Sequence, residues 1–192
     1  MNREILFPTP IYMKMVKDPK KLNKYLYPLI KAWSKKDKSE TKTNAGGGWH
    51  SPTDMNHKKE YEPLIQELFQ MQNEIIEEEH LDIKPRLGNM WANINPPGGY
   101  NNSHIHPNSL FSGVYYVKAQ PNSGRLSLMD PRPGVQQCMP TRKPGKIPRE
   151  FWREIHYEPV PGRLIMFPSW MWHKVEPNQS NDIRISVSFN FI

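Results

Sequence analysis

Three histidines have a spacing that suits a metal site. His104 and His106 are two residues apart, shortly after the turn sequence Pro96-Pro97-Gly98-Gly99. On an extended backbone, side chains two residues apart point to the same side, so both imidazoles can face one interior point. His173 lies on a late predicted strand, and a jelly roll brings early and late strands together around one cavity. Because imidazole binds iron, zinc, copper and nickel, these three side chains predict a metal site.

A structural role is the alternative for any histidine, because most lone histidines simply form hydrogen bonds in a core or on a surface. The His-x-His pair with a distal histidine favours metal binding over that alternative. We assign no chemistry to His57, His80 and His156, which lie at polar helix flanks or in a charged strand. The role of His50 stays open because it follows a glycine run, and we interpret the loop 46–51 as a candidate lid.

A basic group and a hydroxyl share one face of the last predicted strand, where Arg184 and Ser186 follow His173. A guanidinium can bind a carboxylate through two hydrogen bonds, and a hydroxyl adds a directional contact. An arginine inside a β-core needs an anionic partner, whereas an outward Arg184 would pair with a surface acid. The alternation of this strand leaves open which face looks inward, but a ligand-binding barrel would have a polar interior.

A β-rich second half must position these groups. Proline and glycine turns separate the candidate strands, which are 88–95, 111–118, 125–129, 154–158, 163–167, 171–175 and 183–191. Short strands at such intervals predict a sandwich or barrel. Residues 5–12 are interrupted by prolines and predict an edge strand or a lead-in. Residues 132–150 predict a mobile loop.

The first part of the chain is predicted to be helical. Apolar residues at helical spacing indicate amphipathic helices over about 19–36 and 60–79. We therefore expect one domain over 1–192, with a helical lead-in part over 1–84 and a β-core over 85–192. The expected fold class is mainly β with two buttressing helices.

The composition gives little information about the reaction. The chain has 192 residues, 36% apolar and 23% charged, with a formal net charge of +7. The excess lies in residues 1–60, which hold 13 Lys or Arg against 6 Asp or Glu, whereas residues 61–192 hold 13 of each. A row of lysines on one helix is usually a solvated surface. Nucleic acid is therefore a weaker expectation than an unidentified small-molecule or peptidyl substrate, and the oligomeric state stays open.

Several protein classes are disfavoured by the sequence. The single cysteine, Cys138, excludes an internal disulfide framework. The sequence holds no run of about 18 apolar residues to span a bilayer, and residues 1–10 lack the layout of a signal peptide. We therefore expect a soluble, cytoplasmic protein with no membrane association.

Taken in order, the motifs of this chain resemble those of the 2-oxoglutarate- and iron(II)-dependent oxygenases, including small members from bacteria and tailed phages. The resemblance covers the region from about Leu87 to the C-terminus and extends to two motifs near the front. The similar motifs are Phe7-Pro8-Thr9-Pro10, Gly48-Trp49-His50-Ser51, Trp91-x-Asn93-x-Asn95, His104-x-His106-Pro107, Ser112-Gly113-Val114-Tyr115-Tyr116, Asp130-Pro131-Arg132, Phe167-Pro168-Ser169-Trp170-x-x-His173 and Arg184-x-Ser186-x-Ser188-Phe189-Asn190.

The resemblance implies a double-stranded β-helix (jelly roll) with Fe(II), 2-oxoglutarate and O₂ as cofactor and cosubstrates, and ascorbate as an optional reductant. It implies a cytoplasmic enzyme that a phage could encode and its bacterial host produce. The implied reaction is the hydroxylation of a C–H bond with release of succinate and CO₂. Prolyl hydroxylation is a mild favourite, from a likeness around Val114-Tyr115-Tyr116-Val117 at the level of fold only.

The resemblance also implies a role for each residue of the site. His104 would be the first metal ligand and His173 the distal one. Arg184 would bind the far carboxylate of 2-oxoglutarate. Ser186 and Tyr116 would assist it. Apart from the resemblance, Asn93 lies on the strand before the site and is a further candidate for the cosubstrate site, where it would orient the substrate or a water molecule. A structural role is the alternative for Asn93.

The chain departs from the family at the position that usually holds a carboxylate ligand, where it has His106. One interpretation is a three-histidine site, a second recruits Asp130, and a third leaves water in place of the acid. We favour His106 as the third ligand, because its two-residue spacing from His104 aims it at the same point. Asp130 is kept in reserve.

Two other functions are weighed against the oxygenase. One is a non-catalytic jelly roll that binds a ligand, such as a phage structural part. The other is a three-histidine dioxygenase of cupin type that consumes O₂ without 2-oxoglutarate. The Arg184-x-Ser186 motif, at its spacing from His173, argues against the second.

Overall fold

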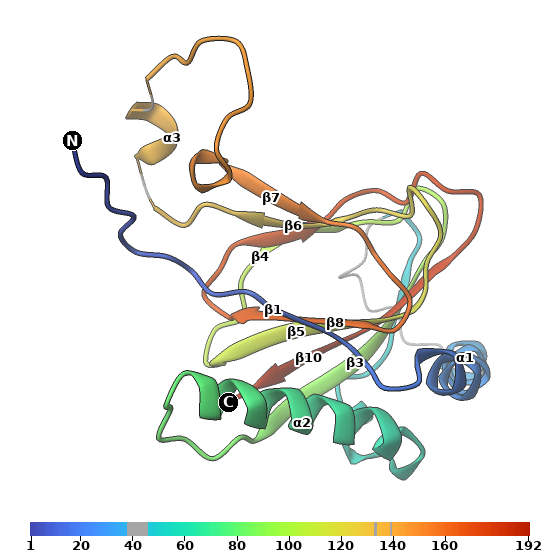
Figure 1. The fold of residues 1–192 in the computed structure, drawn as a ribbon. Helices are drawn as coiled ribbons and strands as arrows, with labels where there is room; N and C mark the ends of the chain where they lie inside the picture. Colours follow the sequence, from blue (N-terminus) through green and yellow to red (C-terminus); the bar gives the residue numbers. More distant parts are fainter. Residues whose placement is uncertain (38–45, 133, 139) are drawn as a thin grey trace.

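Two antiparallel sheets packed face to face form the body of the protein in the computed structural model (Figure 1). The structure describes residues 1–37, 46–132, 134–138 and 140–192. Within these residues, the larger sheet contains β1 (Tyr12–Met15), β2 (Trp49–His50), β3 (Leu87–Asn95), β5 (Phe111–Lys118), β8 (Arg163–Pro168) and β10 (Arg184–Phe191). The smaller sheet contains β4 (Asn101–His104), β6 (Leu126–Met129), β7 (Glu154–Tyr157) and β9 (His173–Val175).

The order of the strands defines the topology. It is β1-β8-β5-β10-β3-β2 in the larger sheet and β4-β9-β6-β7 in the smaller one. Strands distant in sequence are therefore neighbours, and from β3 to β10 the chain crosses between the sheets at every connection except the one from β6 to β7, as in a double-stranded β-helix. The expected fold class, mainly β with two N-terminal helices, is confirmed.

Every strand predicted over the second half is present within two residues of its expected bounds. At the front, residues before Tyr12 are a lead-in, because Pro8 and Pro10 have no N–H group to donate to a ladder. The first strand follows them at the edge of the larger sheet. The sequence does not predict β4, whose residues Asn-Asn-Ser-His show no apolar alternation.

Both expected helices are present as α1 (Pro19–Lys36) and α2 (Glu62–Glu78). Asp18 caps α1, because its Oδ1 accepts a hydrogen bond of 3.1 Å from the backbone N–H of Lys21. The stretch expected to be a loop over 132–150 contains a short helix, α3 (Val135–Cys138). The described residues also form three 3₁₀ helices, Met55–His57, Lys59–Tyr61 and Arg149–Phe151.

Two hydrophobic cores lie on opposite sides of the larger sheet. The first core lies against α1 and α2, which cover the face turned away from the smaller sheet (Figure 1). It includes the apolar side of β10, with Ile185, Val187 and Phe189. The second core lies between the sheets and consists of Tyr116, Leu126, Leu128, Ile165, Phe167 and Met171. The polar side of β10 therefore faces the space between the sheets.

No helix in the described part of the chain has the length and apolar character needed to cross a lipid bilayer.

Candidate metal centre and anion pocket

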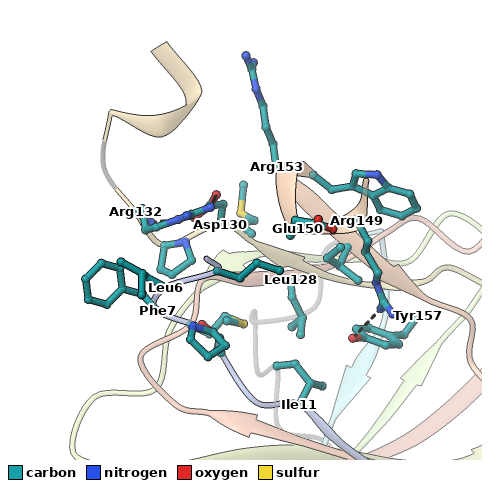
Figure 2. A pocket seen from close by; sticks show the side chains of 18 residues that line it. Leu6, Phe7, Ile11, Leu128, Asp130, Arg132, Arg149, Glu150, Arg153 and Tyr157 are labelled. Carbon is teal, nitrogen blue, oxygen red and sulfur yellow. Dashed lines mark hydrogen bonds and ion pairs between the residues drawn. The ribbon is translucent and has the colours of Figure 1, made fainter. Parts of the chain in front are cut away.

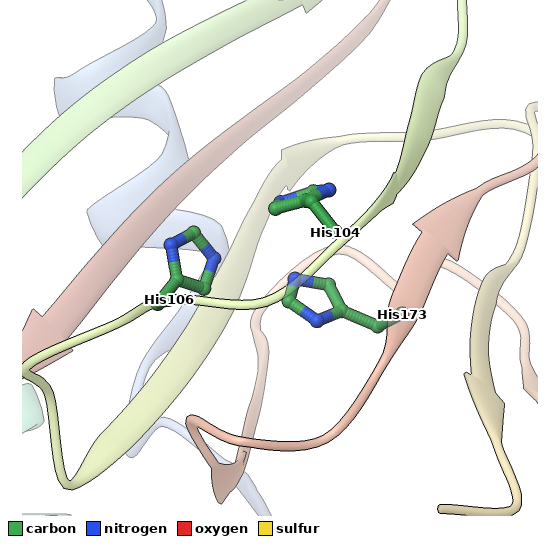
Figure 3. A group of neighbouring side chains, drawn as sticks. All are labelled: His104, His106 and His173. Atoms are coloured by element: carbon green, nitrogen blue, oxygen red, sulfur yellow. The ribbon is translucent and has the colours of Figure 1, made fainter.

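The three histidines that the sequence singles out lie together between the sheets (Figure 3). Strands β4 and β9 are neighbours, and His104 is the direct register partner of His173. His106 follows two residues after the end of β4. When one ring nitrogen is taken from each histidine, the three nitrogens lie within 4.8 Å of one another. The structure thus brings all three predicted ligands to one point.

Backbone carbonyls orient two of the three rings. Nδ1 of His104 lies 2.7 Å from the carbonyl oxygen of Asn102, and Nδ1 of His173 lies 2.9 Å from that of Met171. An Nδ1–H group that donates to a carbonyl leaves the lone pair on Nε2. This arrangement fixes the tautomer that can bind a metal through Nε2.

Burial also keeps two of the rings, those of His106 and His173, neutral. Burial, with a smaller contribution from nearby His104, lowers the pKa of His106 from 6.5 to about 4. Burial and the neighbouring imidazoles lower the pKa of His173 to about 3. Metal binding requires unprotonated imidazole, so at neutral pH neither of these rings must first lose a proton.

A buried arginine lies in the same pocket. Arg184 is only 1% exposed and lines the pocket together with the three histidines. Its Nη1 donates to the carbonyl oxygens of Ser123 and Gly124, the second at 3.0 Å. At Gly124, φ is +91° and a Cβ would overlap the guanidinium, so only glycine permits this close approach.

The charge of Arg184 has no counter-ion in the described part of the chain, where both of its hydrogen-bond acceptors are carbonyls. Burial accordingly lowers its pKa to about 10. A buried charge without a partner is costly. The pocket is therefore suited to an anion.

Three further residues assigned to the cosubstrate line this pocket, namely Tyr116, Ser186 and Asn93. Ser186 lies opposite Tyr116 on one neighbouring strand and opposite Asn93 on the other. Burial raises the pKa of Tyr116 to about 12, although the charge of Arg184 acts in the opposite direction. The phenol keeps its proton and can donate to an anion. Asn93 is held against β10, because its Nδ2 donates to Ser188 Oγ at 3.2 Å.

Asp130, the reserve ligand, lies in a different cavity of about 260 Å³ (Figure 2). Its carboxylate accepts two hydrogen bonds from Arg132, from Nε at 2.9 Å and from Nη2 at 2.7 Å. These bonds lower the pKa of Asp130. Among the described residues, two groups could hold a metal ion, one of which consists of the three histidines, and neither contains Asp130.

Sequence reasoning leaves the role of His50 open. The structure places His50 in β2, 7% exposed, with its ring stacked on Trp91. The indole in turn contacts His106, with ring centroids 5.7 Å apart. Part of the expected lid is thus an edge strand of the larger sheet. The carbonyls of Ser123 and Gly124 were missed, because nothing in the sequence links this turn to an arginine 60 residues later.

Comparison with known proteins is consistent with this geometry. Residues 89–190 match a family model described as "Putative 2OG-Fe(II) oxygenase". No curated protein sequence matches the chain.

Solved structures show the same fold at low sequence identity. A prolyl-4-hydroxylase from Pseudomonas putida is 18% identical, with a TM-score of 0.66 over 95% of this chain and 92% of that one. The non-heme α-ketoglutarate-dependent epimerase SnoN from nogalamycin biosynthesis is 12% identical, with a TM-score of 0.66 over 96% and 76%. HygX from Streptomyces hygroscopicus, solved with nickel and 2-oxoglutarate bound, is 7% identical, with a TM-score of 0.63 over 95% and 82%.

Proposed function

We propose that this chain, which belongs to the family of 2-oxoglutarate- and Fe(II)-dependent oxygenases, hydroxylates a C–H bond of an unidentified substrate. The reaction would convert 2-oxoglutarate and O₂ to succinate and CO₂. One observation carries the proposal: three imidazoles line the same pocket as a buried arginine that has no carboxylate partner among the described residues.

The residues present fit a divalent iron ion. His104, His106 and His173 would hold it, since imidazole is a suitable ligand for iron and their nitrogens already converge. Burial keeps His106 and His173 unprotonated by lowering the pKa of each. The three ligands are neutral, so they offset less of the charge of the ion than two histidines and a carboxylate would.

The pocket also fits 2-oxoglutarate, which carries two carboxylates. Nη1 of Arg184 is held by two carbonyls, and the guanidinium still has further N–H donors for a carboxylate. The protonated phenol of Tyr116 and the hydroxyl of Ser186 line the same pocket. We assign all three to binding the carboxylate that lies away from the metal.

In this mechanism, the bound metal, 2-oxoglutarate and O₂ together supply the oxidant that removes hydrogen from the substrate. The chain's own groups bind and orient. Arg184 fixes the cosubstrate at one end, and the histidines fix the metal. Arg184 and Tyr116 are 1% and 2% exposed, so water is excluded where the cosubstrate carboxylate binds. Removing water strengthens each of these electrostatic contacts.

One observation favours a second candidate, a three-histidine dioxygenase that does not use 2-oxoglutarate. His106 occupies the position where the family usually has an acid, as cupin-type sites with neutral ligands would require. The buried charge of Arg184 weighs against this candidate wherever its substrate carries no anionic group, because the arginine would then stay uncompensated.

Succinate formation tests the proposal. Protein loaded anaerobically with Fe(II) receives 2-oxoglutarate and O₂, with and without a library of peptides and metabolites. We expect succinate only when all three components are present, and none from the His173→Ala and Arg184→Met variants. A folded, iron-loaded protein that forms no succinate contradicts the proposal, and oxygen consumption without 2-oxoglutarate would favour the second candidate.

Isotopically labelled O₂ separates hydroxylation from other outcomes of the same chemistry. A hydroxylated product incorporates one labelled oxygen atom, while succinate receives the other. The structural relative SnoN is named as an epimerase, so a turned-over substrate without label would indicate that kind of reaction and contradict hydroxylation.

A further inference from the structure

The third proposed ligand is held differently from the other two. His104 and His173 are oriented by hydrogen bonds from Nδ1 to backbone carbonyls. In the described part of the chain, the ring of His106 instead has aromatic neighbours: His104, His173 and Trp91. A ring held without hydrogen bonds can rotate unless packing fixes it. Trp91 is the one of these neighbours that is not itself a proposed ligand.

Trp91 is itself in contact with a further ring, that of His50. The ring of His50 stacks on the indole at 5.5 Å between centroids, with 20° between the planes. The indole meets the ring of His106 at 5.7 Å and 54°. Trp91 is 9% exposed and His50 is 7% exposed, so both are packed on most sides. Aromatic pairs at such distances stabilise their arrangement beyond simple burial.

Backbone hydrogen bonds hold His50 in place. Ser51 N–H donates to the carbonyl oxygen of Ala92 at 2.9 Å, and Ala92 N–H donates to Ser51 Oγ at 3.0 Å. His50 Nδ1 also lies 2.6 Å from the carbonyl oxygen of Ser51. These contacts tie β2 to β3, one residue away from Trp91. The ring of His50 is thereby fixed relative to the indole.

The segment that carries His50 is packed as closely at its start. Gly46 has φ of +73°, and a Cβ there would overlap the carbonyl of Gly98 in the turn before β4. The segment from Gly46 to Ser51 therefore lies against β3 and against the turn that joins β3 to β4. It also lies outside residues 89–190, the part of the chain that matches the family model.

From this arrangement we infer that Trp91 and His50 are positioning residues for the metal centre: the stacked pair fixes the orientation of the His106 ring so that it can act as the third ligand. The inference rests on the proposed three-histidine site. In this chain the hydrogen bond that usually orients a ligating histidine is replaced, at His106, by an aromatic stack.

Titration of the metal-free protein with Co(II) tests the inference, because Co(II) has visible absorption bands that report its ligands. Trp91→Leu and His50→Leu remove the ring, while Trp91→Phe and His50→Phe retain one. Trp170→Leu is the matched control, since Trp170 is 53% exposed and precedes His173 by three residues. The Tm of each metal-free variant reports whether the fold is intact.

We expect both leucine variants to bind Co(II) at least about tenfold more weakly, as is found when groups that orient a ligand are removed. Their absorption bands should shift towards those of His106→Ala. Both phenylalanine variants and Trp170→Leu should resemble the wild type in affinity and spectrum. A merely structural role for the stack would change the Tm but leave the spectrum of the bound ion unchanged.

The result that overturns the inference is a His50→Leu or Trp91→Leu protein with wild-type affinity and spectrum, while His106→Ala loses both. If His106→Ala itself binds Co(II) like the wild type, the three-histidine site is wrong, and the inference is wrong with it. The two failures are therefore distinguishable. Should Trp91→Leu not fold, His50→Leu decides alone, because that ring does not touch the proposed ligands.

Discussion

The two faces of the smaller sheet each carry three possible metal ligands, but only the inner face leaves them available. On the inner face are His104, His106 and His173, and on the outer face are Glu154, His156 and Glu176. The ligand atoms of each group lie within 4.8 Å of one another. By spacing alone the two groups are equivalent.

The outer group already has its partners. Glu176 accepts two hydrogen bonds from Arg125, at 2.6 and 3.0 Å, and Glu154 lies 2.9 Å from the ammonium of Lys174. Nδ1 of His156 is 2.8 Å from the hydroxyl of Ser127. A cation would have to displace two basic side chains to bind there.

On the inner face, burial keeps His106 and His173 neutral by lowering the pKa of each. Among the described residues that line the pocket, the one charged group is Arg184, whose hydrogen-bond acceptors are carbonyls and not a carboxylate. Converging ligand atoms therefore do not define a metal site by themselves. What matters is whether the fold has already satisfied their charge and hydrogen bonds.

The largest expected difference between the faces is in metal binding. His173→Ala should weaken Co(II) or Fe(II) binding by more than about 100-fold, beyond the range typical of residues that only orient a ligand. His156→Ala, the matched change on the outer face, should leave it unchanged. Metal titration of both variants checks this, and equal effects would abolish the distinction between the faces.

The second largest expected effect is on the binding of 2-oxoglutarate, which should depend on Arg184 and not on Arg125. Arg184→Met should weaken 2-oxoglutarate binding by about 2–5 kcal/mol, the range for a buried charge pair, or roughly 30-fold and more. Arg125→Met should not affect it, because its partner is Glu176. Calorimetry with the metal-loaded proteins measures both, and wild-type binding by Arg184→Met would remove the basis for the anion pocket.

The same substitution should not lower the stability of the ligand-free protein, because it removes a buried charge that no carboxylate compensates. Chemical denaturation of Arg184→Met checks this sign. A clear loss of stability would mean that the two carbonyl contacts of Arg184 outweigh the cost of burying it.

A smaller effect is expected on the pH dependence of stability. The folded protein lowers the pKa of His106 to about 4 and that of His173 to about 3, against 6.5 for free histidine. Below about pH 6.5 the unfolded chain therefore binds protons that the folded chain does not, and stability falls as the pH falls towards 4. Denaturation with a chelator present, between pH 7.5 and 5, measures this slope.

His106→Phe should reduce that slope, because it removes one of the groups that protonate only on unfolding. The lowered pKa of Glu176 on the outer face affects stability only near and below its ordinary value of 4.5, outside this range. Stability that stays flat or rises between pH 7.5 and 5 would contradict the burial of neutral imidazoles.

The smallest effect is expected from the outer ion pairs. Glu176→Gln should cost about 1 kcal/mol or less in unfolding free energy, as exposed pairs usually do. Binding of Co(II) and 2-oxoglutarate should be unchanged. A change in either would show that the outer face is coupled to the pocket.

Features of the site that depend on local geometry could be predicted from the sequence. The two-residue spacing of His104 and His106 follows from the geometry of an extended chain, and the alternation along β10 correctly places Arg184 and Ser186 on one side. The strand Phe111–Lys118 and the helix Pro19–Lys36 have the predicted bounds. In each case neighbouring residues carry the whole signal.

Features that depend on contacts between residues far apart in the sequence could not be predicted. The inward direction of Arg184 is set by the helices, which cover the apolar side of β10. Its two carbonyl partners lie 60 and 61 residues earlier. Trp91 reaches His106 only because β3 and the chain after β4 lie on the same pocket. By contrast Asp130 is paired with Arg132 two residues later, and this local alternative to metal binding could have been weighed from the sequence.

A crystal structure of the protein with Fe(II) and 2-oxoglutarate, grown without oxygen, tests the central claim most directly. We expect one ion bound by Nε2 of His104, His106 and His173, with the far carboxylate of 2-oxoglutarate on Arg184. An ion bound without His106, or held by Asp130, or located at Glu154, His156 and Glu176, would contradict this account.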